Sequence, residues 1–108
     1  MFTTVATRQF GDWLDGLADD RARKRIAARI VRVEAGLLGD VRSVGGKVGE
    51  LRVDYGPGYR VYFTRRGAVL IVLLCGGDKS TQAGDISTAQ LMVTELDAAD
   101  KTAAKRKK

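Results

Sequence analysis

The stretch that decides the fold runs from residue 50 to residue 64 and reads ELRVDYGPGYRVYFT. In both of its halves apolar side chains alternate with polar ones, as in a β-strand that buries one face. Residues 55–58, YGPG, interrupt the alternation with residue types that favour turns. The stretch therefore predicts a β-hairpin with one apolar face and one exposed polar face.

The expected pairing of this hairpin indicates a function for its polar face. A hairpin centred on its turn sets Arg52 opposite Arg60 and Glu50 opposite Tyr62. Like charges that face each other destabilise a sheet, so two facing arginines favour phosphate binding, with a tyrosine ring nearby for base stacking. The alternative is a structural one, in which both arginines pair with Glu50 and Asp54.

Beyond the hairpin, the chain continues into a strand, a loop and a helix. Residues 68–75 are apolar at every position, which predicts a strand covered on both faces in the middle of the sheet. Residues 76–82, GGDKSTQ, are expected to form a loop. The apolar spacing over residues 86–96 predicts a last helix.

Before the hairpin, residues 2–6 favour a strand. Apolar residues over 10–17 recur at i, i+3, i+4 and i+7, which predicts a helix that begins near Arg8. Residues 40–49 are basic and rich in glycine, so we expect a loop there. The sequence thus predicts strand, helix, helix, three strands and helix.

The second of these helices, with Asp19 or Asp20 as its cap and Gly36 at its end, has a basic side. Its basic residues are Arg21, Lys24, Arg25, Arg29 and Arg32. This side is either a solvated surface or a contact for RNA phosphate or for an acidic segment of a partner.

Composition narrows the classes of function. The 108 residues include one cysteine and no histidine, which excludes an internal disulfide and any histidine-dependent triad or zinc site, so no metal or cofactor is expected. Cys75 is expected to fill the core. The longest apolar run and the N-terminus predict neither a membrane helix nor a secretory signal, so we expect a cytoplasmic protein with no membrane partner.

The formal net charge of +6 is unevenly distributed. Residues 101–108 contain five basic residues and no acidic one, which predicts a disordered basic tail after a single domain over 1–100. Residues 21–66 contain twelve basic and four acidic residues. The middle of the chain is therefore the candidate anion-binding surface.

Three further side chains are candidates for binding. Lys79 lies in the loop after the apolar strand, a common position for functional groups, and Gln82 follows in the same loop. Lys47 lies in the basic segment before the hairpin. The alternative for Lys79 is a turn lysine that pairs with Asp78.

Three motifs follow one another along the chain: GELRV at 49–53, YGPGYRVYF at 55–63 and LLCGGDKSTQ at 73–82. In this order they resemble the RelE/ParE toxin superfamily and look most like the addiction-module killer proteins related to HigB. The resemblance covers residues 2–97. It implies an α+β fold of the microbial RNase type, with a four-stranded, mainly antiparallel sheet and the first two helices on one side.

The resemblance also implies a type II toxin that cleaves messenger RNA on the ribosome without a metal ion and is neutralised by a cognate antitoxin, typically a helix-turn-helix protein. By position in the motifs, Arg52 and Arg60 would hold phosphate, and Lys79 would protonate the leaving oxygen or bind charge. The remaining candidates for the general base or for base stacking are Tyr59, Tyr62 and Glu50. Lys47 and Gln82 are candidates for substrate binding.

Two features of the family pattern are missing, because the chain has no histidine and no tyrosine after Tyr62. The general base is therefore unassigned. A ParE-like inhibitor of DNA gyrase without nuclease activity is the second interpretation, and a relative that only binds its antitoxin is the third. The arginines of the hairpin and Lys79 favour the nuclease.

Overall fold

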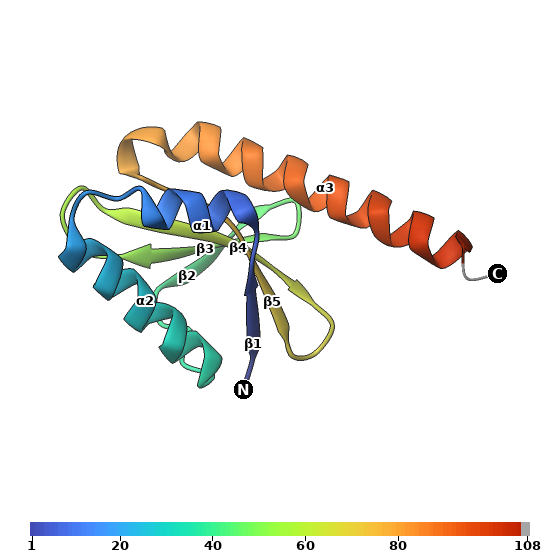
Figure 1. Ribbon diagram of the computed structural model, residues 1–108, viewed down its shortest axis with the longest axis horizontal. Coiled ribbons are helices and arrows are strands. Elements are labelled where there is room, and N and C mark those ends of the chain that lie inside the picture. Colours follow the sequence, from blue (N-terminus) through green and yellow to red (C-terminus); the bar gives the residue numbers. More distant parts are fainter. Residues whose placement is uncertain (107–108) are drawn as a thin grey trace.

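A computed structural model describes residues 1–106 of the chain as a five-stranded sheet with helices on both of its faces (Figure 1). The elements are, in order, β1 (Thr3–Ala6), α1 (Arg8–Asp15), α2 (Asp20–Glu34), β2 (Val41–Gly45), β3 (Val48–Val53), β4 (Tyr59–Arg66), β5 (Leu70–Asp78), the short 3₁₀ helix η1 (Lys79–Thr81) and α3 (Gln82–Arg106). The strand order is β1-β5-β4-β3-β2. Only β1 and β5 pair in parallel. The α+β, mainly antiparallel fold is thus confirmed.

The predicted hairpin is present as β3 and β4. Its register sets Arg52 opposite Arg60 and Glu50 opposite Tyr62, as the symmetric pairing predicted. The turn between the strands favours glycine at position 56, where φ is +56°. A residue with a Cβ atom adopts this left-handed conformation at a higher free energy than glycine does.

The predicted count of four strands is wrong, because β2 occupies part of the segment expected to be a loop. β2 pairs antiparallel with β3, and its ladder shifts between Ser43 and Gly45. The glycines there serve this shift and the turn that follows, where Gly45 and Gly46 have positive φ values. They therefore end a strand rather than prevent one.

β5 also differs from its prediction. It extends three residues past the expected end at Cys75, through Gly76, Gly77 and Asp78, so the predicted loop starts later and is largely η1. It lies between β1 and β4, and the middle strand of the sheet is β4. Cys75 is buried, as expected.

α1 and α2 begin where the sequence predicts. Thr7 caps α1, and Asp19, one of the two expected caps, accepts hydrogen bonds from the backbone of Arg21 and Ala22 at the start of α2. The chain leaves α2 through Gly36, whose φ is +91°. Both helices pack on one face of the sheet, where Phe10 and Ile26 join a core with Val61.

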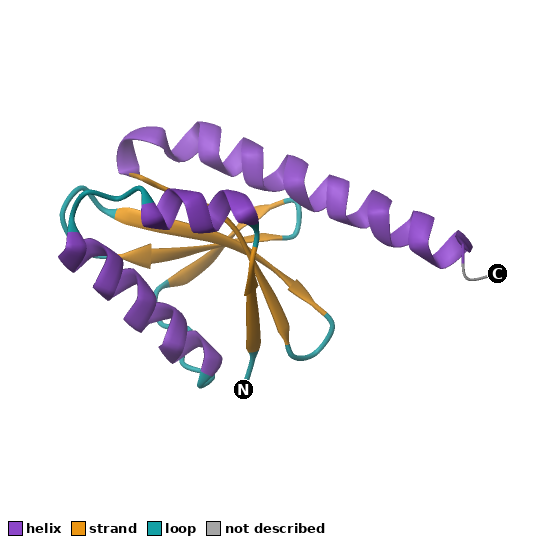
Figure 2. Ribbon diagram, viewed as in Figure 1, coloured by secondary structure: helices purple, strands orange, loops and turns teal. Residues whose placement is uncertain are grey.

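The other face is covered by α3, which crosses the sheet and extends beyond it (Figure 2). Ala89 and Val93 of this helix pack in a second core with Tyr62 and Leu74. The expectation of an exposed polar face is therefore wrong for most of that face, although Arg52 stays partly exposed and Asp54 exposed. Its residues Glu50, Arg60, Tyr62 and Thr64 are all buried.

α3 continues through residues 101–106, which the sequence predicts to be disordered. Alanine, lysine and arginine favour helix and the segment has neither glycine nor proline, so an existing helix can propagate through it. Residues 107–108 of the predicted tail lie outside the described residues. Within residues 1–106, no helix combines the length and the apolar character needed to cross a membrane.

Gly76→Ala should lower the free energy of unfolding by about 1–3 kcal/mol, because the new methyl group would overlap the ring of Trp13. Gly84→Ala is the control. No atom lies within 4 Å of the position that its methyl group would take on exposed α3, so it should be neutral or stabilise by up to about 1 kcal/mol. Urea unfolding measures both, and equal stability of the two variants would contradict this packing.

Candidate functional site

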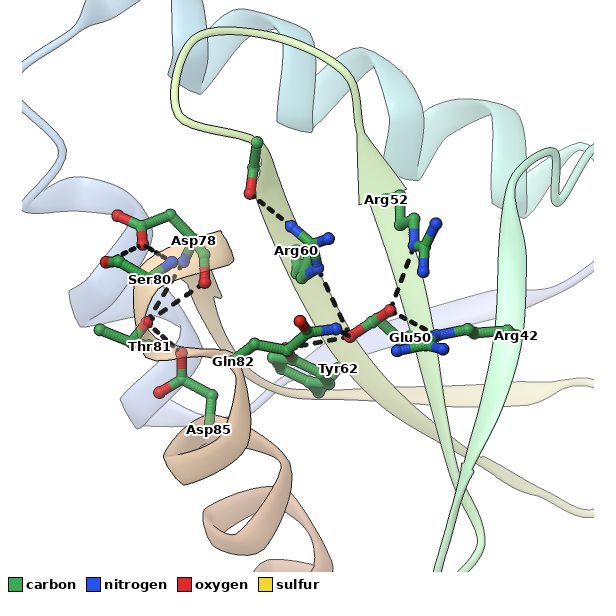
Figure 3. A network of polar contacts seen from close by, with 11 residues as sticks. Arg42, Glu50, Arg52, Arg60, Tyr62, Asp78, Ser80, Thr81, Gln82 and Asp85 are labelled. Atoms are coloured by element: carbon green, nitrogen blue, oxygen red, sulfur yellow. Dashed lines mark hydrogen bonds and ion pairs between the residues drawn. The ribbon is translucent and has the colours of Figure 1, made fainter.

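The candidate site is built around the carboxylate of Glu50 on β3, which is fully buried (Figure 3). Its Oε1 accepts a hydrogen bond from Nε of Arg42 at 2.9 Å and one from Nε of Arg52 at 3.3 Å. Arg42 lies directly opposite Glu50 on β2, and Arg52 lies two residues farther along β3, on the same face. This oxygen therefore joins two neighbouring strands.

The second oxygen of Glu50 faces β4 and the start of α3. Its Oε2 accepts from the hydroxyl of Tyr62 at 3.2 Å and from Nε2 of Gln82 at 2.7 Å, and it lies 3.6 Å from Nε of Arg60. Gln82, a predicted substrate-binding residue, thus reaches the centre of the network. Glu50 connects three strands to the last helix.

The surroundings of Glu50 favour its charged form. Burial acts to raise its pKa, but hydrogen bonds from Gln82, Arg42 and Arg52 outweigh that effect, so the pKa lies below its ordinary value. Burial and the nearby charge of Glu50 raise the pKa of Tyr62. At neutral pH Glu50 is therefore an anion and Tyr62 is a neutral hydrogen-bond donor. Neither side chain is exposed, so neither can accept a proton from a substrate.

Arg60 is held from two sides. Its Nη1 donates to the carbonyl of Gly58 at 2.9 Å, and its Nε faces Glu50 without a hydrogen bond of its own. The side chain is only 10% exposed. A guanidinium group held in this way reaches a ligand with little loss of conformational freedom.

The three residues predicted to be catalytic line one pocket of about 310 Å³, here called the Arg60 hollow. Its lining residues are Asp40, Arg52, Val53, Asp54, Gly58, Tyr59, Arg60 and Lys79. Arg52 comes from β3, Arg60 from β4 and Lys79 from η1. The structure therefore brings together three cations from three elements.

Lys79 is exposed at the start of η1. The Asp78 carboxylate accepts hydrogen bonds from the backbone and hydroxyl of Ser80, which lower its pKa. Among the described residues, Lys79 and Asp78 form no ion pair, so the alternative of a paired turn lysine does not describe this structure.

Three predicted binding residues, Lys47, Tyr59 and Tyr62, present little or no surface to a ligand in the Arg60 hollow. Lys47 lies in the turn between β2 and β3, where its Nζ is 3.2 Å from a carboxylate oxygen of Asp97 on α3, and it does not line the Arg60 hollow. Tyr59 does line the hollow, but its ring packs edge-on against Trp13 and is 9% exposed. Burial raises its pKa, with Asp19 and Asp78 adding to the effect. The ring of Tyr62 is fully buried and offers no face for stacking.

Sequence reasoning missed Arg42. The glycines after it favoured a loop, and in a loop its side chain has no defined direction. No local pattern could have found it, because Val41, Arg42, Ser43 and Val44 do not alternate between apolar and polar residues. Within residues 1–106 there is no group of three side chains suited to hold a metal ion. The arginine and lysine side chains that line the Arg60 hollow can stabilise negative charge.

Glu50→Gln should lower the free energy of unfolding at neutral pH on the order of 1–3 kcal/mol, because charged hydrogen bonds are lost. It should also flatten the dependence of stability on pH in acid. Folding lowers the pKa of Glu50 below 4.5, so its contribution is complete above that pH and is lost as the pH falls through the lower value of the folded state. Urea titrations between neutral pH and pH 3 measure this, with exposed Asp12→Asn as the control. A Glu50→Gln profile parallel to that of the wild type would contradict the network.

Parts of the sequence are similar to known proteins. A protein from Haemophilus influenzae named "Uncharacterized protein" is 50% identical over 90 residues, which cover 83% of this chain and 91% of the relative. The family model described as phage derived protein Gp49-like (DUF891) matches residues 12–106, which include the Glu50 network and the Arg60 hollow. The chain therefore belongs to the Gp49-like family of phage-derived proteins.

Proposed function

We propose that this protein is the toxin of a type II toxin–antitoxin system and cleaves messenger RNA on the ribosome without a metal ion. The observation that carries the proposal is the convergence of Arg52, Arg60 and Lys79 on one hollow. The Gp49-like family is associated with RelE-like toxins, which supports the same class of function. We also propose that the protein is related to the HigB toxins.

The hollow fits the demands of phosphoryl chemistry. When a ribose 2′-hydroxyl attacks the neighbouring phosphate, its proton passes to solvent water, a bond forms between the 2′-oxygen and phosphorus, and the bond from phosphorus to the leaving 5′-oxygen breaks. Negative charge then accumulates on the phosphoryl oxygens and on the leaving 5′-oxygen. Arg60 is preorganised to bind the phosphoryl oxygens, and the exposed ammonium group of Lys79 can donate a proton or hold the leaving oxygen. Arg52, whose side chain is 37% exposed, completes the cationic wall.

The proposal assigns no general base within the chain. Glu50 is buried and occupied by its partners, and Tyr62 is its donor. Alignment of the 2′-hydroxyl with the phosphate is therefore the main requirement, and a ribosome that holds the RNA in place can supply it. We therefore expect the protein to act on ribosome-bound messenger RNA in the cytoplasm.

A cognate antitoxin completes the proposed system, and the family resemblance assigns it to the helix-turn-helix class. An acidic segment that covers Arg52, Arg60 and Lys79 would block the substrate directly, since these cations gather at one surface of the molecule.

Arg60→Ala should lower the rate of messenger RNA cleavage by about 100-fold or more, because one preorganised charge is removed from the phosphate site. Arg60→Lys should also be impaired, since an ammonium group lacks the forked geometry of a guanidinium group. The cleavage rate is measured by primer extension after each purified variant is mixed with ribosomes that carry a messenger RNA.

Because Arg60 is buried, Lys79→Ala serves as a second variant that should lose activity without losing stability. Arg65→Ala is the matched control: this exposed arginine stacks on the ring of Phe2, away from the Arg60 hollow. Wild-type cleavage rates in both Arg60→Ala and Lys79→Ala would refute the assignment of the hollow.

Induction of the wild-type protein in cells should stop incorporation of labelled amino acids before that of thymidine. A primary block of thymidine incorporation would instead identify a ParE-like gyrase inhibitor, and the absence of both effects would identify a protein that only binds its antitoxin. The control is to induce the protein together with its proposed antitoxin, which should restore growth.

A further inference from the structure

A second and larger hollow adjoins the Arg60 hollow. It measures about 450 Å³, and we call it the α2 hollow. Its lining residues are Arg25, Ala28, Arg29, Arg32, Gly39, Asp40, Arg52, Val53 and Asp54. Four of them, Asp40, Arg52, Val53 and Asp54, also line the Arg60 hollow. The two hollows therefore share a wall, and Arg52 belongs to both.

Three of the four arginines come from one stripe of α2. Arg25, Arg29 and Arg32 lie at i, i+4 and i+7, which sets them on the same side of the helix. Arg29 has a structural task, because its guanidinium group donates to the backbone carbonyls of Leu38 and Asp40. These hydrogen bonds hold residues 38–40 in place, and Gly39 and Asp40 of this segment line the hollow.

The other two arginines of the stripe are available to a ligand. Arg25 is exposed and lies with its guanidinium carbon 4.7 Å from the centre of the Tyr55 ring, which limits its motion. Arg32 is exposed and, within residues 1–106, forms no ion pair.

The arginines outnumber the acids of the α2 hollow by four to two. Burial lowers the pKa of Arg29 and the charge of Arg32 lowers it further, while Asp40 acts in the opposite direction, so the stripe contains like charges close enough to repel. Repulsion of this kind is relieved when an anion binds between the charges. All the cations are arginines, whose forked donors match phosphate oxygens.

We propose that the α2 hollow is a second phosphate subsite, which holds the RNA backbone next to the phosphate that is cleaved in the Arg60 hollow. This inference rests on the proposed function and deepens it. The continuity of the two hollows through Arg52 favours a polymer with a regularly repeating charge, so RNA fits better than an acidic peptide. Arg25 and Arg32 would bind phosphate, while Arg29 keeps the hollow open.

The test is the salt dependence of RNA binding by Arg25→Ala/Arg32→Ala. The probe is a short single-stranded RNA with methylated 2′-hydroxyls, which cannot be cleaved. Each lost phosphate contact lowers the slope of log affinity against log salt by about 0.7, so the double variant should have a slope roughly 1.4 smaller than the wild type. Circular dichroism and thermal unfolding establish that both variants fold.

The matched control is Arg8→Ala/Arg65→Ala, which removes the same charge from exposed positions outside both hollows. Its slope should stay close to that of the wild type. Equal slopes for the two double variants would overturn the subsite. A loss of binding to a polyglutamate peptide without a change in the RNA slope would also overturn it, in favour of a protein segment.

Failure of the proposed function gives a different result. In that case the unmodified wild-type protein does not cleave ribosome-bound messenger RNA, while the slopes measured with the methylated probe still report whether the α2 hollow binds phosphate.

Discussion

The buried carboxylate of Glu50 is the constraint on which the rest of the site depends. An ionised carboxylate removed from water destabilises a protein strongly unless charged partners and hydrogen bonds compensate. Here the compensation comes from β2, β3, β4 and the first residue of α3. Stable burial of Glu50 therefore requires the sheet and the last helix to dock together, and it also explains why Arg52 and Arg60 can face each other across the hairpin.

The hydrogen bonds and ion pairs of Glu50 determine how the arginine side chains are oriented. Arg42, Arg52 and Arg60 all turn their Nε toward Glu50 (Figure 3). Glu50 therefore neutralises part of their charge and fixes their orientation at the same time. The two interpretations of the facing arginines, structural pairing and phosphate binding, are in this way compatible, because the carboxylate that pairs with them also preorganises them.

The sequence predicted those features that depend on local periodicity. The register of the hairpin follows from alternation and a central turn, and so the meeting of Arg52 with Arg60 could be foreseen. The helix cap at Asp19 follows from local chemistry in the same way. The position of Lys79 beside them follows from the antiparallel pairing of β4 with β5, which sets Tyr59 opposite Asp78 and so brings η1 to the start of β4.

Features that depend on tertiary packing could not be predicted. Whether the polar face of the hairpin meets water is decided by α3, which carries only a weak apolar stripe, so the burial of Glu50 and Tyr62 was missed. β2 is an edge strand and obtains its order from pairing with β3 rather than from its own residues. Lys47 was expected near the RNA because of its charge, but the turn geometry directs it to Asp97 on α3.

The parallel pairing of β1 with β5 determines when the nascent chain can complete its sheet. Residues 3–6 find their partner strand only in residues 70–73, and β5 must insert between β1 and β4. Contacts so distant in sequence form late, because a long loop must close first. Gln82, the last partner of Glu50, follows still later. A newly synthesised chain therefore remains without an assembled site until β5 and the start of α3 have left the exit tunnel.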